Sequence, residues 1–323
     1  MIDQFGRSID YLRISITDRC NLRCRYCMPQ GAEPLGHGDI LRFEEILRVC
    51  RAAAALGVTR FKITGGEPLV RRGCAELVAG IKAIPGAEQV TLTTNGLLLD
   101  AQLDALLEAG LDAVNVSLDS LDPARCRAIS GSPAADPARL LAVLRRCCGR
   151  GLRTKINTVL LPENRDDWVP LAALAGELPL DVRFIELMPV GFGGRIERVR
   201  PEEALEALRA RWGDLRPCAE KRGNGPAHYY RSDALTGRIG FIDAVSHKFC
   251  ASCNRVRLTS TGLLKPCLCF DSGCDLRALL RGGASDEALR EALRGAIYEK
   301  PRSHSFDEAE RITERRLMSQ IGG

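Results

Sequence analysis

Up to about residue 190, the chain alternates between short apolar runs typical of strands and longer runs with the 3.6-residue period of a helix. The short runs predict six strands, at residues 11–17, 60–64, 90–94, 113–118, 154–160 and 181–187. Helices are expected at 43–56, 74–84, 100–108 and 167–178, and another from Asp136-Pro137 to Gly149 or Gly151. This alternation predicts an α/β fold with a parallel sheet, doubly wound or curved into a barrel.

Beyond residue 187 the alternation stops. Gly191-Phe192-Gly193-Gly194 reads as a flexible link, residues 201–211 as a helix, and 221–227 as a loop. We expect a partial (β/α)6 TIM-like barrel over residues 1–235 and a C-terminal region over 236–323 that closes it.

The composition limits which cellular compartment and which kinds of binding partner are expected. The 323 residues are 45% hydrophobic, yet no stretch reaches the roughly 18 apolar residues of a membrane span, and the first residues lack a signal-peptide core. We therefore expect a cytoplasmic protein with no membrane contact, whose 14 cysteines are reduced and available for metals or catalysis. The net charge of +5 permits a phosphate-bearing ligand without requiring nucleic acid.

Three cysteines follow the first predicted strand in a C-x3-C-x2-C spacing, Cys20, Cys24 and Cys27. Structural zinc sites and ferredoxin-type clusters normally take four protein ligands. A compact trio therefore indicates a metal with one coordination position left open. A zinc knuckle that takes a distant fourth ligand is the alternative.

A second group of thiols lies in the C-terminal region. Cys250 and Cys253 form a C-x2-C pair, followed by Cys267, with Cys269 and Cys274 close by. A zinc ribbon that uses Cys269 as the fourth ligand is compatible with this spacing.

Basic residues recur on one face of the predicted strands. Period two places Arg13 with Ser15 and Thr17, and Arg60 with Lys62 and Thr64. Lys155, Asn157 and Arg183 extend this lining, and the pair Arg255 and Arg257 can face the same way. Because parallel strands are usually buried on both faces, several cations there indicate an anionic ligand such as a triphosphate. Arg13 and Arg60 stand at strand starts, where solvation is the alternative.

The first trio with Tyr26, and the turn Gly65-Gly66-Glu67-Pro68, resemble the radical S-adenosylmethionine (SAM) superfamily. The remaining motifs resemble the GTP 3′,8-cyclase family of molybdenum cofactor biosynthesis, over essentially the whole chain. They are Cys250-x2-Cys253-Asn254-Arg255-Val256-Arg257 with Cys267, Thr93-Thr94-Asn95-Gly96, residues 183–188, and the terminal Gly322-Gly323.

The resemblance implies two 4Fe-4S clusters, held by Cys20, Cys24 and Cys27 and by Cys250, Cys253 and Cys267, so that the C-terminal extension is cluster-binding. It implies SAM contacts at Tyr26, Gly66, Ser117 and Met188. It implies GTP contacts at Arg13, Lys62, Thr93, Lys155, Arg255, Val256 and Arg257, with Arg60 and Arg183 as further candidates. Lys62 stands where the family usually has arginine, which keeps the charge but loses bidentate geometry.

The implied reaction is that of a radical SAM lyase. It converts GTP to (8S)-3′,8-cyclo-7,8-dihydroguanosine 5′-triphosphate, the first step of molybdopterin biosynthesis, and the catalytic acid and base stay unknown. The implied partners are a low-potential electron donor, such as a flavodoxin or ferredoxin-like protein, and functionally the next enzyme, cyclic pyranopterin monophosphate synthase. A homodimer is compatible with the sequence. The terminal glycines either enter the active site, as the resemblance implies, or form a frayed end.

Two other functions are compatible with parts of this pattern. A radical SAM peptide-maturing enzyme also carries a C-terminal cluster extension, although usually with more cysteines and without the C-x2-C-N-R-V-R run. A zinc-binding scaffold or nucleic-acid adaptor would explain the C-x2-C pair and the mild positive charge.

Overall fold

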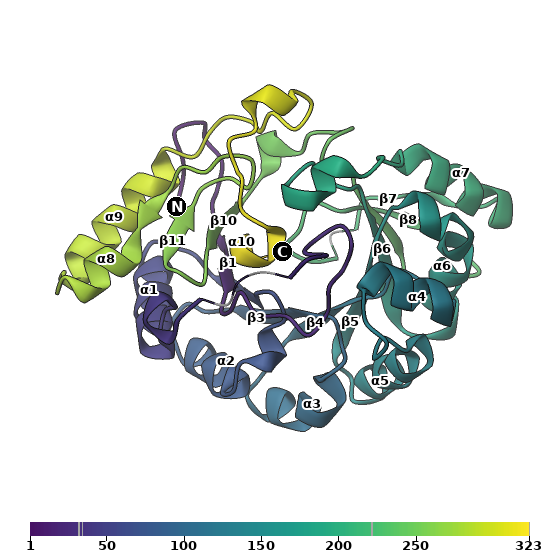
Figure 1. Cartoon of the computed structure of the whole chain (residues 1–323), viewed down its shortest axis with the longest axis horizontal. Coiled ribbons are helices and arrows are strands. Elements are labelled where there is room, and N and C mark those ends of the chain that lie inside the picture. The colour runs from purple at the N-terminus through teal and green to yellow at the C-terminus, as the bar shows by residue number, and fades with distance from the viewer. Residues whose placement is uncertain (32, 34, 221, 323) are drawn as a thin grey trace.

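Twelve strands form a single curved sheet in the computed structural model, which describes residues 1–31, 33, 35–220 and 222–322 (Figure 1). The strands are β1 (Tyr11–Ser15), β2 (Arg60–Thr64), β3 (Gln89–Thr94), β4 (Ala113–Ser117), β5 (Arg153–Val159), β6 (Leu180–Ile185), β7 (Arg216–Cys218), β8 (His228–Arg231), β9 (Ile239–Ile242), β10 (Arg255–Leu258), β11 (Leu263–Lys265) and β12 (Cys274–Asp275).

The order across the sheet is β12-β11-β10-β1-β2-β3-β4-β5-β6-β9-β8-β7. Strands β10, β1 to β6 and β9 run parallel, and the outer strands on both sides pair antiparallel. The sheet ends at β12 and β7 and does not close on itself, which confirms the predicted α/β partial barrel.

Helices cover the outer face of the sheet (Figure 1). They are α1 (Phe43–Ala55), α2 (Cys74–Lys82), α3 (Leu99–Glu108), α4 (Pro123–Ser130), α5 (Pro137–Gly149), α6 (Trp168–Glu177), α7 (Pro201–Arg211), α8 (Leu276–Arg281) and α9 (Asp286–Tyr298), whereas α10 (Met318–Ile321) lies on the inner side. The described residues also form short 3-10 helices, which are η1 (His37–Asp39), η2 (Pro68–Val70), η3 (Pro162–Asp167), η4 (Gly191–Arg195), η5 (Cys250–Ser252) and η6 (Ala309–Arg311).

The start of α5 shows how the local sequence determines an element. The side chain of Asp136 accepts a hydrogen bond from Ala138 N at 3.0 Å, and Pro137 fills the first helical position. The same Asp-Pro signal begins α4, at Asp122 and Pro123, a helix absent from the expectations above.

The two faces of the central strands differ in chemistry. On β1 and β2, Leu12, Ile14, Phe61 and Ile63 are fully buried in the apolar core. The residues between them, Arg13 and Lys62 among them, line a cavity inside the barrel. The core therefore lies between sheet and helices, and the polar face is left for a ligand.

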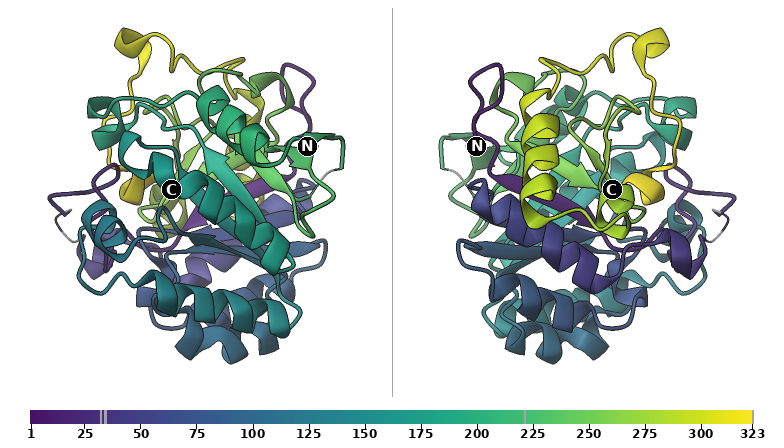
Figure 2. Two further views of the ribbon diagram at one scale, coloured as in Figure 1. Left: turned by 90° about the vertical axis from the view of Figure 1, so that its right-hand side faces the viewer. Right: turned by 90° about the vertical axis from the view of Figure 1, so that its left-hand side faces the viewer.

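The C-terminal region extends the sheet on both sides, because β10 pairs with β1 and β9 with β6. Helix α9 packs beside α1, as Figure 2 shows, and the short α10 lies at the barrel opening (Figure 1). The boundary at residue 235 stays a prediction. Among the described residues, no helix is long and apolar enough to cross a membrane.

Candidate active site

A cavity of about 390 Å³ fills the barrel and brings together most of the predicted site residues. Its lining includes Arg13, Cys20, Cys24, Tyr26, Cys27, Lys62, Gly66, Thr93, Ser117, Lys155, Arg183, Met188, Cys250, Cys253, Arg255, Arg257 and Cys267. The lining does not include Arg60 or Val256. Arg60 Nη1 instead bonds Asp10 Oδ2 at 2.5 Å, and the side chain of Val256 is buried in the core.

The first cysteine trio lies in the loop that follows β1. The amide of Leu22 donates to Cys20 Sγ at 3.4 Å, and the amides of Cys27 and Met28 both donate to the carbonyl of Cys24 at 2.9 Å. Burial, with repulsion from Cys20, raises the pKa of Cys27 to about 12. Burial and nearby negative charge also hold the pKa of Cys24 well above its ordinary value. Three half-buried thiols that repel one another as thiolates fit the cationic core of an iron-sulfur cluster, whose charge would offset that repulsion.

The glycine turn after β2 lies directly against this loop. A Cβ on Gly66 would come within 2.4 Å of Arg19 O and 2.7 Å of Asp18 O, so the contact requires glycine. Glu67 fixes the turn by accepting from Leu69 N at 3.0 Å, Thr94 Oγ1 at 2.7 Å and Asn95 N at 2.7 Å.

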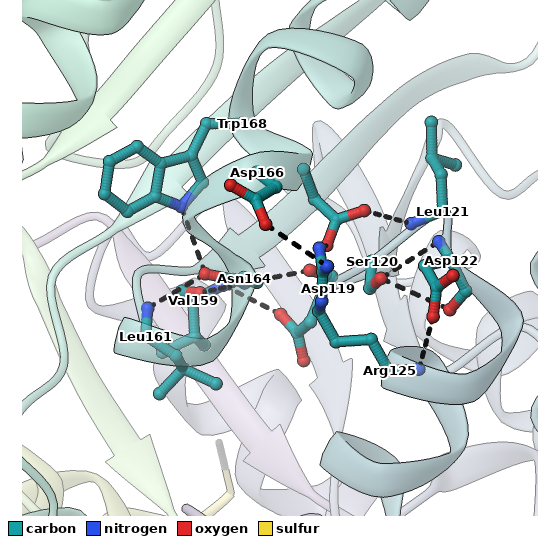
Figure 3. Close-up of polar contacts among 11 residues, drawn as sticks. Asp119, Ser120, Leu121, Asp122, Arg125, Val159, Leu161, Asn164, Asp166 and Trp168 are labelled. Atoms are coloured by element: carbon teal, nitrogen blue, oxygen red, sulfur yellow. Dashed lines mark hydrogen bonds and ion pairs between the residues drawn. The ribbon is translucent and has the colours of Figure 1, made fainter.

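Asp119 connects the first trio to the ends of β4 and β5. Tyr26 Oη donates to Asp119 Oδ2 at 2.8 Å, and Val159 N donates to Oδ1 at 2.8 Å. Figure 3 shows how the buried Asn164 holds this corner, donating to the Asp119 carbonyl and accepting from Trp168 Nε1 at 3.0 Å. Burial raises the pKa of Asp119 to about 6, although both hydrogen bonds act to lower it. Sequence reasoning missed Asp119, because only the fold brings it to Tyr26.

The second trio faces the same cavity from the C-terminal region. Cys250 begins η5, Cys253 follows its last residue, and Cys267 follows β11. The amide of His304 donates to Cys250 Sγ at 3.4 Å. Burial raises the pKa of Cys253, but the charges of Lys300 and Arg255 outweigh it, and the pKa is lowered overall. A lowered thiol pKa eases formation of the thiolate, which is the form that binds a metal.

The two neighbouring cysteines are placed differently. Cys269 is fully buried, accepts from Ser305 N at 3.4 Å, and packs in a small apolar cluster with Val190 and Phe306. Cys274 lies on β12, in register with Leu264. Neither lines the cavity. Within the ranges that the structure describes, no three His, Cys, Asp or Glu side chains gather closely enough for a single metal ion.

Cations form a layer across adjacent strands. Arg257, Arg13 and Lys62 are register neighbours on β10, β1 and β2, and Thr91 follows on β3. Burial, with repulsion from Arg183, Arg13, Lys155 and Arg255, holds the pKa of Lys62 well below its usual value. Burial, with repulsion from Arg13 and Arg255, lowers the pKa of Arg257 to about 9. The layer therefore favours an anion with several charged groups.

Asp181 supplies negative charge at one side of this layer. Its carboxylate lies 3.2 Å from Lys155 Nζ and 3.0 Å from Arg222 Nε. Arg183 donates from Nε and Nη2 to Asn157 Oδ1 at 2.9 and 2.6 Å.

The C-terminal tail reaches the same layer. Gly322 has φ +88°, and a Cβ there would lie 2.8 Å from Ser15 Cβ and 3.3 Å from Thr64 Cγ2. Met318 and Ser319 line the cavity. Gly322 is thus inside the barrel, whereas Gly323 lies outside the described residues.

Among the further lining residues that were not identified from the sequence are Thr91, Arg222, Lys300 and His304. Thr91 shares a strand face with Thr93, so period two could have found it. The other three lie on loops or after a helix, where no periodic pattern marks an inward residue.

An open α/β barrel with a three-cysteine loop packed on a Gly-Gly-Glu-Pro turn defines a radical SAM enzyme. The radical SAM superfamily profile matches residues 14–175, and the profile described as Molybdenum Cofactor Synthesis C matches residues 180–306. The GTP 3′,8-cyclases of Clostridium perfringens strain 13 and Pelotomaculum thermopropionicum are 44% and 46% identical to this chain, over the full length of each. The chain belongs to the GTP 3′,8-cyclase family, which confirms the resemblance predicted from its motifs.

Solved structures resemble the fold at much lower identity. Streptococcus suis SuiB bound to S-adenosylmethionine has a TM-score of 0.65 at 16% identity, covering 97% of this chain and 78% of SuiB. This likeness supports the radical SAM fold.

Proposed function

We propose that the chain converts GTP to (8S)-3′,8-cyclo-7,8-dihydroguanosine 5′-triphosphate, the first step of molybdopterin biosynthesis. The observation that supports this most directly is the layer of buried cations at Arg13, Lys62 and Arg257, in a cavity lined by both cysteine trios. An anion as highly charged as a triphosphate would relieve the repulsion that lowers the pKa of Lys62 and Arg257.

The SAM half of the site comprises the first trio and the residues around it. Cys20, Cys24 and Cys27 would hold a 4Fe-4S cluster with one open iron for SAM. The other proposed SAM contacts, Tyr26, Gly66, Ser117 and Met188, also line the cavity. When bound, cluster and SAM supply the 5′-deoxyadenosyl radical that takes hydrogen from ribose C3′.

GTP would occupy the opposite half. Cys250, Cys253 and Cys267 would hold a second 4Fe-4S cluster next to the guanine, and the cation layer would bind the triphosphate with Lys155, Arg255 and Thr93. Arg183 extends this binding surface, whereas Arg60 and Val256 do not line the cavity. The contribution of the protein is to place ribose and SAM at a fixed separation and to exclude water from them.

We further propose the cellular setting. Thiols that hold clusters must stay reduced, which favours the cytoplasm. A flavodoxin or ferredoxin-like protein would supply electrons, and cyclic pyranopterin monophosphate synthase would take the product. A homodimer is compatible with this arrangement.

The decisive experiment is anaerobic incubation of reconstituted protein with SAM, dithionite and GTP. The proposal requires that 5′-deoxyadenosine and the cyclised nucleotide form together, and only when GTP is present. Formation of 5′-deoxyadenosine with a precursor peptide and not with GTP would favour the peptide-maturing alternative. Protein that contains one zinc per chain and no iron would instead indicate a zinc scaffold.

A further inference from the structure

The loop that carries the first trio has two chemically different sides. Its cysteines line the cavity together with Leu22 and Tyr26, whereas Asn21, Arg23 and Arg25, which lie between the cysteines in sequence, are exposed. Residues 19–31 contain three arginines and no acidic residue. A cluster at this trio is therefore separated from solvent by the thickness of one basic loop.

Arg23 is the centre of this basic side. Its Nη1 donates to the carbonyls of Cys20 and Leu22, both at 2.8 Å, which fixes the guanidinium over the loop. The guanidinium therefore lies against the backbone of Cys20, a proposed cluster ligand. A partner that touches this guanidinium is thus electrostatically close to a cluster ligand.

Helix α4 supports the loop from behind and adds another cation. Arg23 N donates to Ser130 O at 2.9 Å, and Arg25 N donates to Ile129 O at 3.0 Å. Arg127 is exposed one turn earlier on that helix. Arg25 is already paired with Glu163 at 2.5 Å, whereas Arg19, Arg23 and Arg127 form no ion pair in the part of the chain that the structure describes.

We propose that the exposed side chains of Arg19, Arg23 and Arg127, here termed the arginine face, dock an acidic one-electron carrier protein of the flavodoxin class. The inference rests on the proposed function, because it assumes a cluster at Cys20, Cys24 and Cys27. On docking, one electron passes from the carrier to the cluster, so the carrier is oxidised and the cluster reduced by one electron each. Positive charge beside the electron acceptor would steer the acidic carrier toward it, and this attraction would weaken as the salt concentration rises.

The test is the double variant Arg19→Glu/Arg127→Glu, which leaves Arg23 to hold the loop. The matched control is Arg139→Glu/Arg145→Glu, an equal charge change at two exposed positions of α5. Two rates are measured on anaerobically reconstituted protein: bleaching of cluster absorbance by reduced flavodoxin without SAM or GTP, and 5′-deoxyadenosine formation driven by dithionite with SAM and GTP.

The expected result is a flavodoxin-driven bleaching rate about tenfold lower in the Arg19/Arg127 variant, with the control and all dithionite-driven rates within about twofold of wild type. An unchanged bleaching rate, or an equal loss with dithionite, would overturn the proposal. The proposal would also be overturned if the Arg19/Arg127 variant no longer bound a heparin column but was bleached by flavodoxin as fast as wild type. The arginine face would then bind a polyanion. Failure of the proposed GTP reaction would appear separately, as wild-type protein that is bleached by flavodoxin but forms no cyclised nucleotide.

Discussion

Arg257 Nη1 donates a 2.8 Å hydrogen bond to the carbonyl of Gly322, so one cation of the proposed triphosphate site also holds the C-terminal tail in the barrel. Replacing it removes both interactions. We expect Arg257→Met to raise the KM for GTP at least tenfold and Arg257→Lys to raise it less, because lysine keeps the charge but not the fork of donors. The measurement is 5′-deoxyadenosine formation against GTP concentration. Arg231→Met, at an exposed position on β8, is the control, and an unchanged KM in Arg257→Met would remove this residue from the GTP site.

Lys62 should show a conflict between stability and function. It is buried beside other cations that disfavour its charge, so the protein without GTP is destabilised by a residue kept for binding. Lys62→Met should raise the Tm of the GTP-free protein while weakening GTP binding at least tenfold. Thermal unfolding with and without GTP measures both effects, and the GTP-induced rise in Tm should disappear in the variant.

Lys62→Arg is the informative companion. Arginine keeps the charge and restores the bidentate geometry that is usual in the family, so GTP binding should be retained or strengthened. If Lys62→Met binds GTP as tightly as wild type, the cation layer does not hold the triphosphate.

The buried pair Lys265 and Glu314 clamps the tail segment to β11, next to Cys267. Neither side chain has any exposure, and Lys265 Nζ donates both to the Glu314 carboxylate and to Phe270 O. Lys265→Met would remove the buried cation and leave the Glu314 carboxylate to Arg316, whose Nε lies 3.2 Å from Oε1, at a cost of about 3 kcal/mol in the free energy of unfolding. The double variant Lys265→Met/Glu314→Gln should recover most of that loss, because no charge remains buried.

Denaturant unfolding of both variants provides the measurement for this clamp. Arg311→Met, which removes an exposed pair with Glu308 in the same segment, should change stability by less than about 1 kcal/mol. A double variant as unstable as Lys265→Met would show that packing, and not the charge pair, accounts for the loss.

Local sequence was sufficient for much of this architecture. The strand β2 and the helix α7 begin and end at the predicted residues, because a complete apolar period and clear boundary signals coincide there. The cysteine trios and the inward cations were likewise predictable, since spacing and period two act over a few residues.

The rest of the site depends on contacts between distant segments. Tyr26 and Asp119 are 93 residues apart, and Lys265 and Glu314 are 49 apart. No local pattern predicts such pairs, because each residue alone is compatible with an exposed position. Strands β9 and β10 show the same limit, since each pairs with a strand that is distant in sequence, β6 and β1 respectively.

Glu45 joins the barrel helix α1 to the C-terminal region. Its interactions should make the free energy of unfolding fall at acidic pH. It accepts from Arg281 Nε at 2.9 Å and from Arg42 N at 2.7 Å, and the Arg281 bond lowers its pKa to about 2. Because the folded pKa lies below the ordinary 4.5, the stabilisation is complete above pH 4.5 and is lost as the pH falls through 2. Glu45→Gln should therefore lower the free energy of unfolding by about 1.5–3 kcal/mol at pH 7, with the difference shrinking toward pH 2.

Urea unfolding across that pH range checks this dependence. Glu44→Gln, at the exposed neighbouring position, should show no such difference from wild type. If the loss of unfolding free energy in Glu45→Gln stays constant from pH 7 to pH 2, the contact depends on the shape of the side chain and not on its charge.

Iron content separates the two trios. If each holds a 4Fe-4S cluster, wild-type protein reconstituted without oxygen should contain about eight iron atoms per chain, and Cys24→Ala or Cys253→Ala about four each. Only Cys24→Ala should also lose 5′-deoxyadenosine formation entirely, because only the first trio would bind SAM. Cys50→Ala is the matched control, since its fully buried thiol lies on α1 in the apolar core and does not line the cavity. If wild-type protein contains only about four iron atoms per chain and Cys253→Ala contains as many, the second trio holds no cluster. The guanine would then need another partner in the cavity.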